Sequence, residues 1–160
     1  MNLEEDVKEW LSEEDLLREV KFDENADFHY IIEFPNDNIM DVVKPTDKDC
    51  IVIACATQVA PQHKDLMEAS DANTRKEFIM EVNFGLNSFL VDYELQVADD
   101  ILQQFVITDQ IFEDGLSKNE MMKTLKRVFK SKLQCIWLIN EKFGSLQPNS
   151  TASNENDMFI

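Results

Sequence analysis

The segment 26–57, in which short apolar stretches alternate with turns, places the strongest constraint on the fold. Its first stretch has a large apolar side chain at every second position: Phe28, Tyr30, Ile32 and Phe34. A period of two predicts a half-buried strand, and Pro35 ends it because proline cannot donate to a ladder of hydrogen bonds. Asn36-Asp37-Asn38 predicts a hairpin loop, and residues 39–44 predict a second strand. The continuously apolar run 50–57 predicts a third strand covered on both faces, so an antiparallel meander is expected.

Helical periodicity flanks this meander on both sides. Apolar residues near the N-terminus repeat with the spacing of one helix face: Leu3, Val7, Trp10 and Leu11. Where this helix ends is open, because 16–20 either extends it or begins a strand. Pro61 suits the first turn of a helix, and the chain from there to about Leu90 predicts mostly helix, with a kink or break at 70–73.

Two further strands and a long helix complete the predicted order. Alternation over 93–97 predicts a fourth strand, and apolar residues over 102–111 predict a fifth. Ser117 and Glu120 form an S-x-x-E capping box at the start of the last helix, and Gly144 suits its C-cap. The predicted order is α-β-β-β-α-β-β-α. We therefore expect an α+β fold with a five-stranded antiparallel sheet and helices on one face.

The expected organisation is a single α+β domain over 1–143, followed by a disordered C-terminal tail over 144–160. The tail is polar and aperiodic, which is typical of a segment with little to bury. The N-terminus is acidic rather than signal-like, and the longest apolar run is far too short to span a membrane. A cytoplasmic location is expected.

A net charge of -17 limits the classes of partner. Nucleic acids and anionic membranes attract basic surfaces, so neither is an expected partner. An acidic solvated face explains the charge without any partner, and a basic partner segment is the more specific alternative.

No motif in the sequence indicates catalysis, a cofactor or a metal. Cys50, Cys55 and Cys135 are odd in number and form no CxxC pair, which does not fit a disulfide framework or a zinc site, so buried, inert thiols are expected. The three glycines are isolated, which excludes a Gly-rich phosphate loop. The acids between 99 and 114 lack the spacing of a calcium loop and are expected in turns and on the surface.

His29 is the one candidate for acid–base chemistry, within an otherwise apolar strand. Alternation places it on the same face as Ile31 and Glu33. Glu33 is roughly 13 Å away along a strand, too far to orient the ring. We expect a structural histidine, solvated or paired across strands. An enzyme or small-ligand site around His29 and nearby carboxylates is the alternative function.

The last helix carries more apolar surface than docking on one sheet requires. Residues 116–142 also hold seven Lys or Arg and two Asp or Glu, whereas residues 1–115 hold eight Lys or Arg and twenty-eight Asp or Glu. Burial on a broad sheet accounts for the wide apolar face. The alternative is contact with a partner or second subunit, through candidate interface residues Met121, Met122, Leu125, Phe129, Leu138 and Ile139.

Three short motifs carry a resemblance to a known family: "VKEWL" (7–11), "FHYIIEFP" (28–35) and "EDGLS" (113–117). In this order they resemble a small archaeal family of uncharacterised proteins with a type III secretion chaperone-like fold, over about residues 1–143. The resemblance implies a chaperone-like sandwich, and secretion chaperones are acidic homodimers that wrap an extended stretch of a partner. The family has no activity to carry over. Asp15 stands where the family usually has a glycine turn.

The combined expectation is a non-enzymatic protein-binding or chaperone-like module that acts as a homodimer. A basic or extended protein segment is the expected partner.

Overall fold

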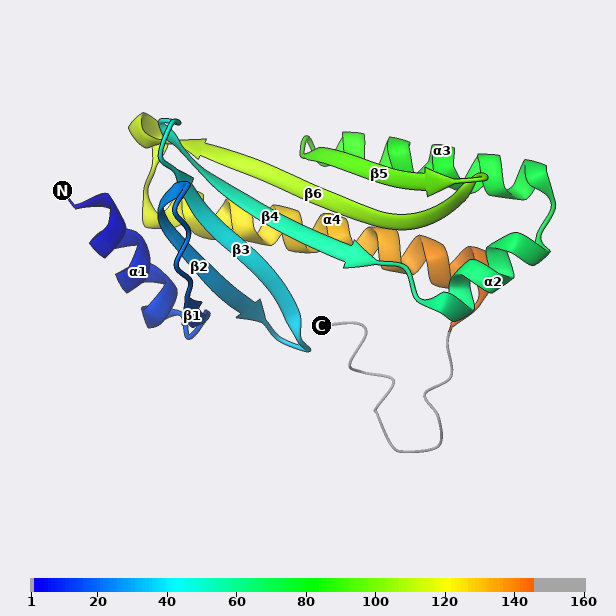
Figure 1. Ribbon diagram of the computed structural model, residues 1–160, viewed down its shortest axis with the longest axis horizontal. Helices are drawn as coiled ribbons and strands as arrows, with labels where there is room; N and C mark the ends of the chain where they lie inside the picture. Colours follow the sequence, from blue (N-terminus) through cyan, green and yellow to red (C-terminus); the bar gives the residue numbers. More distant parts are fainter. Residues whose placement is uncertain (1, 146–160) are drawn as a thin grey trace. The chain divides into compact units, whose positions relative to one another are not determined.

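A computed structural model of the chain describes residues 2–145 (Figure 1). Its elements are α1 (Leu3–Glu13), β1 (Leu17–Val20), β2 (Ala26–Phe34), β3 (Asn38–Pro45), β4 (Cys50–Gln58), α2 (Pro61–Ala69), α3 (Ala72–Ser88), β5 (Asp92–Ala98), β6 (Ile101–Phe112), the 3-10 turn η1 (Glu113–Gly115) and α4 (Lys118–Phe143). The sheet order is β1-β2-β3-β4-β6-β5, and the first three pairings are antiparallel. The predicted α+β class with an antiparallel sheet is confirmed.

The sheet has six strands rather than the predicted five, and the predicted element order was wrong at two places. The missed strand, β1, has only four residues and shows no alternation of buried and exposed side chains, so it carries no period-two signal. The predicted long helix is two helices. Asp71 begins the second one, because its side chain accepts a hydrogen bond from the Thr74 amide at 2.8 Å.

Asp15 ends α1 by adopting the backbone conformation that a glycine would usually supply. Its φ is 55°. The Asp15 amide donates to the Ser12 carbonyl at 3.0 Å, and the Leu16 amide donates to the Leu11 carbonyl at 2.9 Å. This pair of bonds is a Schellman motif. An aspartate tolerates the left-handed region better than most residues, so the helix can stop here without a glycine.

Contacts divide the chain into two compact units. The first unit comprises the chain up to Cys55 together with Thr108–Phe129, and the second comprises Ala56–Ile107 together with the chain from Lys130. The single domain expected over 1–143 stays a prediction. Most of the predicted disordered tail, from residue 146 onward, lies outside the described residues.

The first unit packs α1 and the N-terminal half of α4 onto strands β2, β3 and β4. Val7 and Leu11 are the buried face of α1. The Tyr30 hydroxyl donates to the Glu4 carbonyl at 3.4 Å, and burial, with a smaller effect of Glu4, raises the pKa of Tyr30 to about 12. Phe34 of β2 stacks on Phe129 of α4 with ring centroids 5.1 Å apart.

The second unit packs α3 and the C-terminal half of α4 onto β5 and β6. Phe78, Val82 and Leu86 form the buried stripe of α3. The rings of Phe78 and Phe143 meet edge to face at 5.0 Å. Gly85 allows a close approach of α3 to α4, since a Cβ added there would lie 3.1 Å from Gln134 Oε1.

None of the helices over residues 2–145 is both long enough and apolar enough to cross a membrane.

Phe129→Ala should lower the free energy of unfolding by about 3–5 kcal/mol, because it removes a buried ring and leaves a cavity beside Phe34. Phe112 is the matched control. It is 56% exposed in the same unit, so Phe112→Ala should cost within about 0.5 kcal/mol. Urea unfolding followed by circular dichroism measures both. Equal costs for the two variants would contradict the placement of α4.

Candidate functional site

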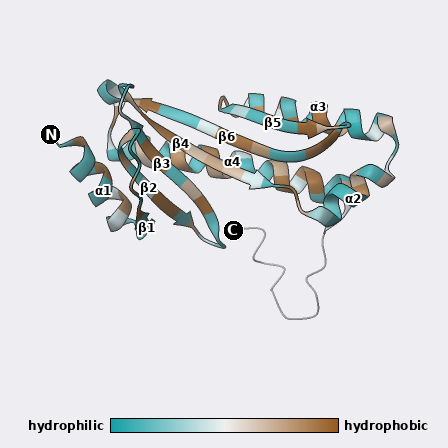
Figure 2. Ribbon diagram, in the orientation of Figure 1, coloured by the Kyte–Doolittle hydropathy of each residue, from teal (hydrophilic) through white to brown (hydrophobic). Residues whose placement is uncertain are grey.

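The structure buries most of the interface that the sequence suggested on α4. Met121, Leu125, Phe129 and Ile139 are all buried, while Met122 and Leu138 are partly exposed. Figure 2 shows how hydrophobic and hydrophilic residues follow one another along the helix. The wide apolar face is therefore used mainly inside the chain, and four of the six candidates cannot line a surface without opening the core.

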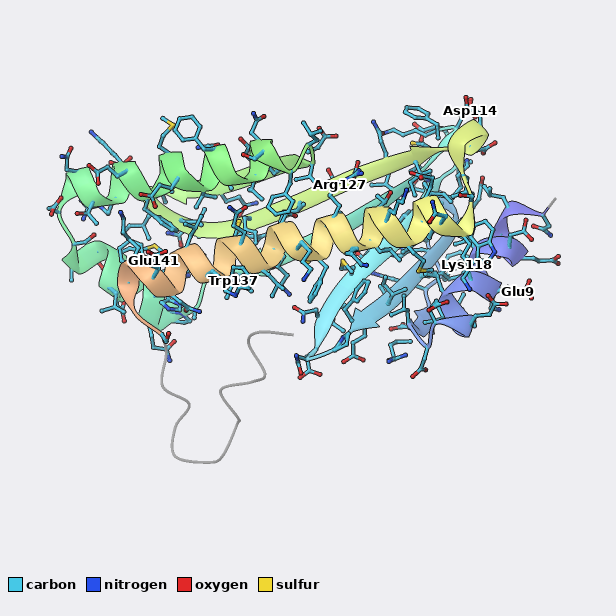
Figure 3. The ribbon with its side chains drawn as sticks, turned by 180° about the vertical axis from the view of Figure 1, so that it is seen from behind. Glu9, Asp114, Lys118, Arg127, Trp137 and Glu141 are labelled. Carbon is cyan, nitrogen blue, oxygen red and sulfur yellow. The ribbon has the colours of Figure 1, made fainter. Side chains whose placement is uncertain are left out.

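Basic residues of α4 pair with acidic groups of the same chain. Lys118, at the start of α4 (Figure 3), lies 2.7 Å from Glu13 and 2.9 Å from Glu14. Arg127 lies 2.9 Å from Asp109. Exposed pairs contribute only about 0–1 kcal/mol each. They nevertheless satisfy part of the helix's positive charge without a second copy.

His29 is buried between two carboxylates, so of the two expected alternatives, a solvated ring or a ring paired across strands, the ring is not solvated. Its exposed fraction is 7%. Nδ1 lies 3.1 Å from Asp23 Oδ2, and Nε2 lies 3.6 Å from Asp41 Oδ2. Asp41 is on β3, two residues before Val43, which is the residue paired with His29. The cross-strand neighbour expected for His29 is thus an aspartate on the adjacent strand.

This arrangement is poorly suited to general acid–base chemistry. Nε2 of His29 is inaccessible to solvent and makes no hydrogen bond to any residue between 2 and 145. A general base must come within hydrogen-bond reach of the proton that it removes, and here both ring nitrogens face carboxylates of the chain itself. These contacts favour a structural role for His29.

The cysteines and the remaining acids occupy structural positions. All three cysteines are buried thiols, and burial raises the pKa of the Cys135 thiol to about 12, which keeps it protonated and weakly nucleophilic. Asp99 and Asp100 form the β5–β6 turn with positive φ. Within residues 2–145, no group of three His, Cys, Asp or Glu side chains is placed to hold a metal ion.

An exposed apolar surface on α3, absent from the sequence-based predictions, is the more informative feature. Met80, Phe84 and Leu90 are exposed on and just after this helix, by 51%, 67% and 84%. They lie off the buried stripe, so the helical pattern alone did not distinguish them from core residues. The Tyr93 hydroxyl of β5 donates to the Asn83 side chain at 3.0 Å, which places β5 beside this part of α3 (Figure 1).

Leu90 combines high exposure with an unfavourable backbone conformation. Its φ is 61°, and the other non-glycine residues with positive φ between residues 2 and 145 are all Asp or Asn. A left-handed conformation costs an aliphatic residue roughly 1–2 kcal/mol. Neither core packing nor turn geometry requires a leucine here. Such a combination at one residue is a reason to look for a contact outside the chain.

β5 is one of the two edge strands of the sheet, and the two edges differ. The other edge, β1, is short and has an irregular register between Leu17 and Glu19. Its Arg18 binds Glu33 at 2.9 Å. A bulge and a charged side chain are devices that discourage another strand from pairing. β5 is seven residues long, and within the described range no strand lies beyond it.

The chain around β5 is uniformly acidic. From Glu77 to Ser117 there are nine Asp or Glu residues and no Lys or Arg. Asp92 and Glu94 are exposed on β5 itself, and Asp99 and Asp100 follow in the turn. We define the β5 surface as the strand Asp92–Ala98 together with Met80, Phe84 and Leu90.

Residues 3–139 match a family described as "Uncharacterized conserved protein (DUF2299)". The chain belongs to this family. A comparison with curated protein sequences found no match.

Solved structures provide two further comparisons. An uncharacterized protein from the methanogenic archaeon Methanothermobacter thermautotrophicus is 45% identical, with a TM-score of 0.85 over 88% of this chain and 99% of that one. This confirms the expected uncharacterised family, whereas its link to secretion chaperones stays a prediction. YbjN from E. coli, described as a candidate transcription regulator, is 14% identical with a TM-score of 0.42 over 84% of this chain and 87% of that one. That likeness assigns neither a fold nor a function.

Asp23→Asn should destabilise the protein at neutral pH by an amount that shrinks as the pH falls. The Asn25 amide, and next the His29 ring, lower the pKa of Asp23. A carboxyl group whose pKa is lower in the folded protein than in the unfolded chain stabilises the fold at any pH above the unfolded-state pKa, which is about 3.9. This stabilisation is lost as the pH falls through the folded-state pKa. Chemical unfolding at several pH values between neutral and acid measures the difference. Asp47→Asn, in the exposed β3–β4 turn, is the control. A wild-type advantage that stays constant down to the acid limit would contradict this account.

Leu90→Gly should raise the free energy of unfolding by up to about 1 kcal/mol. The substitution removes the steric cost of a leucine in the left-handed conformation, which stabilises the folded state. Part of this gain is offset because glycine raises the conformational entropy of the unfolded chain. Leu90→Ala keeps the Cβ and should change stability by less than about 0.5 kcal/mol. Thermal unfolding of both variants tests this. Destabilisation by the glycine would mean that the leucine side chain packs within the chain.

Proposed function

We propose that this protein is a non-enzymatic protein-binding module whose partner lays a basic, extended segment along β5. The observation that carries the proposal is Leu90, a highly exposed leucine with positive φ at the start of an open edge strand. Three features of the β5 surface favour a basic, extended segment as the partner: the open backbone of the strand, the exposed apolar side chains and the negative charge.

The backbone of β5 provides the first contribution. An edge strand presents unpaired amide and carbonyl groups on its outer side, and an extended peptide can satisfy them by adding a strand. Main-chain hydrogen bonds of this kind give affinity with little dependence on sequence. Specificity must therefore come from side chains beside the edge.

Exposed apolar side chains in the same part of the chain provide the second contribution. Met80 and Phe84 lie on the exposed face of α3, the helix that Tyr93 of β5 contacts through Asn83. Leu90 precedes the strand, and Val97 near its other end is 42% exposed. A partner with apolar residues at alternate positions could cover these side chains. Aromatic and methionine side chains are also the types enriched in protein interfaces.

Charge provides the third contribution. Asp92 and Glu94 project from β5, and no Lys or Arg occurs between residues 77 and 117. A basic segment would be attracted and oriented by this field, whereas nucleic acid and an acidic peptide would be repelled. The same charge makes the binding sensitive to salt.

Homodimerisation and a chaperone-like role remain part of the proposal on the strength of the resemblance alone. Secretion chaperones wrap an extended stretch of a partner, which agrees with a partner strand at β5. The apolar residues of α4 give the dimer little support, because most of them are buried.

The test uses a labelled peptide of about ten residues that alternates Lys and Val, long enough to pair along a typical strand. Fluorescence anisotropy should show saturable binding that weakens with salt, and no binding of the matched Glu–Val peptide. Phe84→Ser and Leu90→Gly should each weaken binding by about tenfold, a loss of roughly 1.4 kcal/mol. Ile39→Ser removes an exposed apolar side chain from the first unit and should leave binding unchanged.

Two results would contradict the proposal. One is equal binding of the Lys–Val and Glu–Val peptides, which would remove the role of charge. The other is an equal loss of affinity in Ile39→Ser and Phe84→Ser, which would place the contact elsewhere.

A further inference from the structure

A mostly apolar pocket of about 210 Å³ lies wholly within the second unit, between the end of β4, the start of α2, β6 and α4. Its apolar lining includes Val59, Phe105, Ile136 and Ile139. An engineered apolar cavity of about 150 Å³ binds benzene, so this pocket has room for an aromatic ring. None of its lining residues belongs to the β5 surface, so its occupant is a separate question from the partner of β5.

The chain leaves α4 beside this pocket. Ile139 and Asn140 line the pocket, and the Gly144 amide donates to the Asn140 carbonyl at 2.8 Å. His63, another lining residue, is buried, and its Nε2 lies 2.9 Å from the Gly144 carbonyl oxygen. A carbonyl only accepts, so Nε2 donates. The residues that follow Gly144 therefore start from the wall of the pocket.

The sequence that follows contains one cluster of large apolar residues. Residues 147–157 have none, and Met158, Phe159 and Ile160 then follow one another. Aromatic and methionine side chains are enriched in the buried cores of interfaces, so this cluster departs from the polar composition of the rest of the tail. For scale, a flexible linker of about twelve residues has an r.m.s. end-to-end distance of roughly 20 Å. The stretch 146–157 is thus long enough to bring Phe159 back to a pocket beside Gly144.

We propose that Met158–Ile160 of the same chain occupies this pocket, with the Phe159 ring against Ile136 and Ile139. Tethering favours this occupant over a second copy or a separate partner. A short linker gives the tethered segment an effective concentration in about the millimolar range, so even a weak contact is formed most of the time. The segment would keep the pocket closed to other apolar ligands until it is displaced.

Charge at the pocket also suits this segment. The lining residue Ala60 is the N-cap of α2, and the first turn of this helix has no Asp or Glu. The free amides at a helix N-terminus carry partial positive charge, which favours a carboxylate nearby. Asp157 directly precedes the apolar cluster. With Phe159 in the pocket, the Asp157 carboxylate could approach the start of α2.

The first measurement is a nuclear Overhauser experiment on the full-length protein. We expect contacts between the ring protons of Phe159 and the methyl groups of Ile136 and Ile139. Phe159→Ser should remove these contacts and shift the amide signals of 57–60, 63 and 140. Leu146→Ser is the matched control, because it removes a large apolar side chain from the same tail but outside the cluster. It should leave the Phe159 contacts in place.

The second measurement adds a synthetic peptide of residues 154–160 to the full-length protein. The peptide should bind Phe159→Ser saturably, and it should bind the wild type about tenfold more weakly, because the tethered segment competes at its effective concentration. A peptide with serine in place of the phenylalanine should not bind.

A pair of α4 variants tests the pocket side of the contact. Ile136 and Leu138 are both partly exposed residues of α4 in the second unit, but only Ile136 lines this pocket. In the Phe159→Ser background, Ile136→Ser should weaken binding of the peptide at least fivefold, whereas Leu138→Ser should leave it unchanged.

Three outcomes would overturn the proposal. The first is that Phe159 makes no contact with Ile136 or Ile139 in the wild type. The second is that such contacts occur only between differently labelled molecules in a mixed sample, which would make a second copy the occupant. The third is equal binding of the peptide to the wild type and to Phe159→Ser, which would mean that the pocket is open to a separate partner. Failure of the Lys–Val peptide to bind at β5 would leave these results untouched, because the two sites share no residue.

Discussion

Burial of the apolar residues of α4 is the interaction on which the rest of the structure depends. Residues of this helix up to Phe129 belong to the first unit and those from Lys130 to the second, so each unit has part of its core on the same helix. Phe34 stacks on Phe129 in one, and Phe143 meets Phe78 in the other. With these side chains in the cores, the apolar surface that α4 keeps includes Trp137, exposed by 45%, and the partly exposed Met122 and Leu138. The proposed interaction surface lies on other elements.

The two edge strands of the sheet, β1 and β5, differ in length and regularity, and this difference bears on where a partner could bind. β1 is short, irregular in register and held by Arg18, although Val20 and Phe22 at this edge are exposed by 56% and 91%. β5 is longer and follows Leu90, which is exposed by 84%. A regular sheet edge can pair with an extended segment, and the proposed partner would add its strand to β5.

Sequence patterns predicted the parts of the fold that carry a strong period. Alternation over 28–34 located β2, and the capping box located α4, where the Glu120 amide donates to Ser117 at 3.2 Å. The pattern left β1 open, because four residues are too few for a period. The kink or break expected at 70–73 is a break between two helices, where the Asp71 side chain caps the second one. The functional surfaces were less accessible. Periodicity does not show that the face of β2 that carries His29 meets two aspartates. It also does not show that Leu90 has a positive φ.

The most direct test of the central claim is amide hydrogen exchange of the wild-type protein, with and without a saturating basic extended peptide. If β5 receives a strand, exchange should slow across Asp92–Ala98 and in the adjoining residues of α3, while β1 is unaffected. Slower exchange at β1 or on α4, with β5 unchanged, would contradict the claim that β5 is the edge that receives the partner.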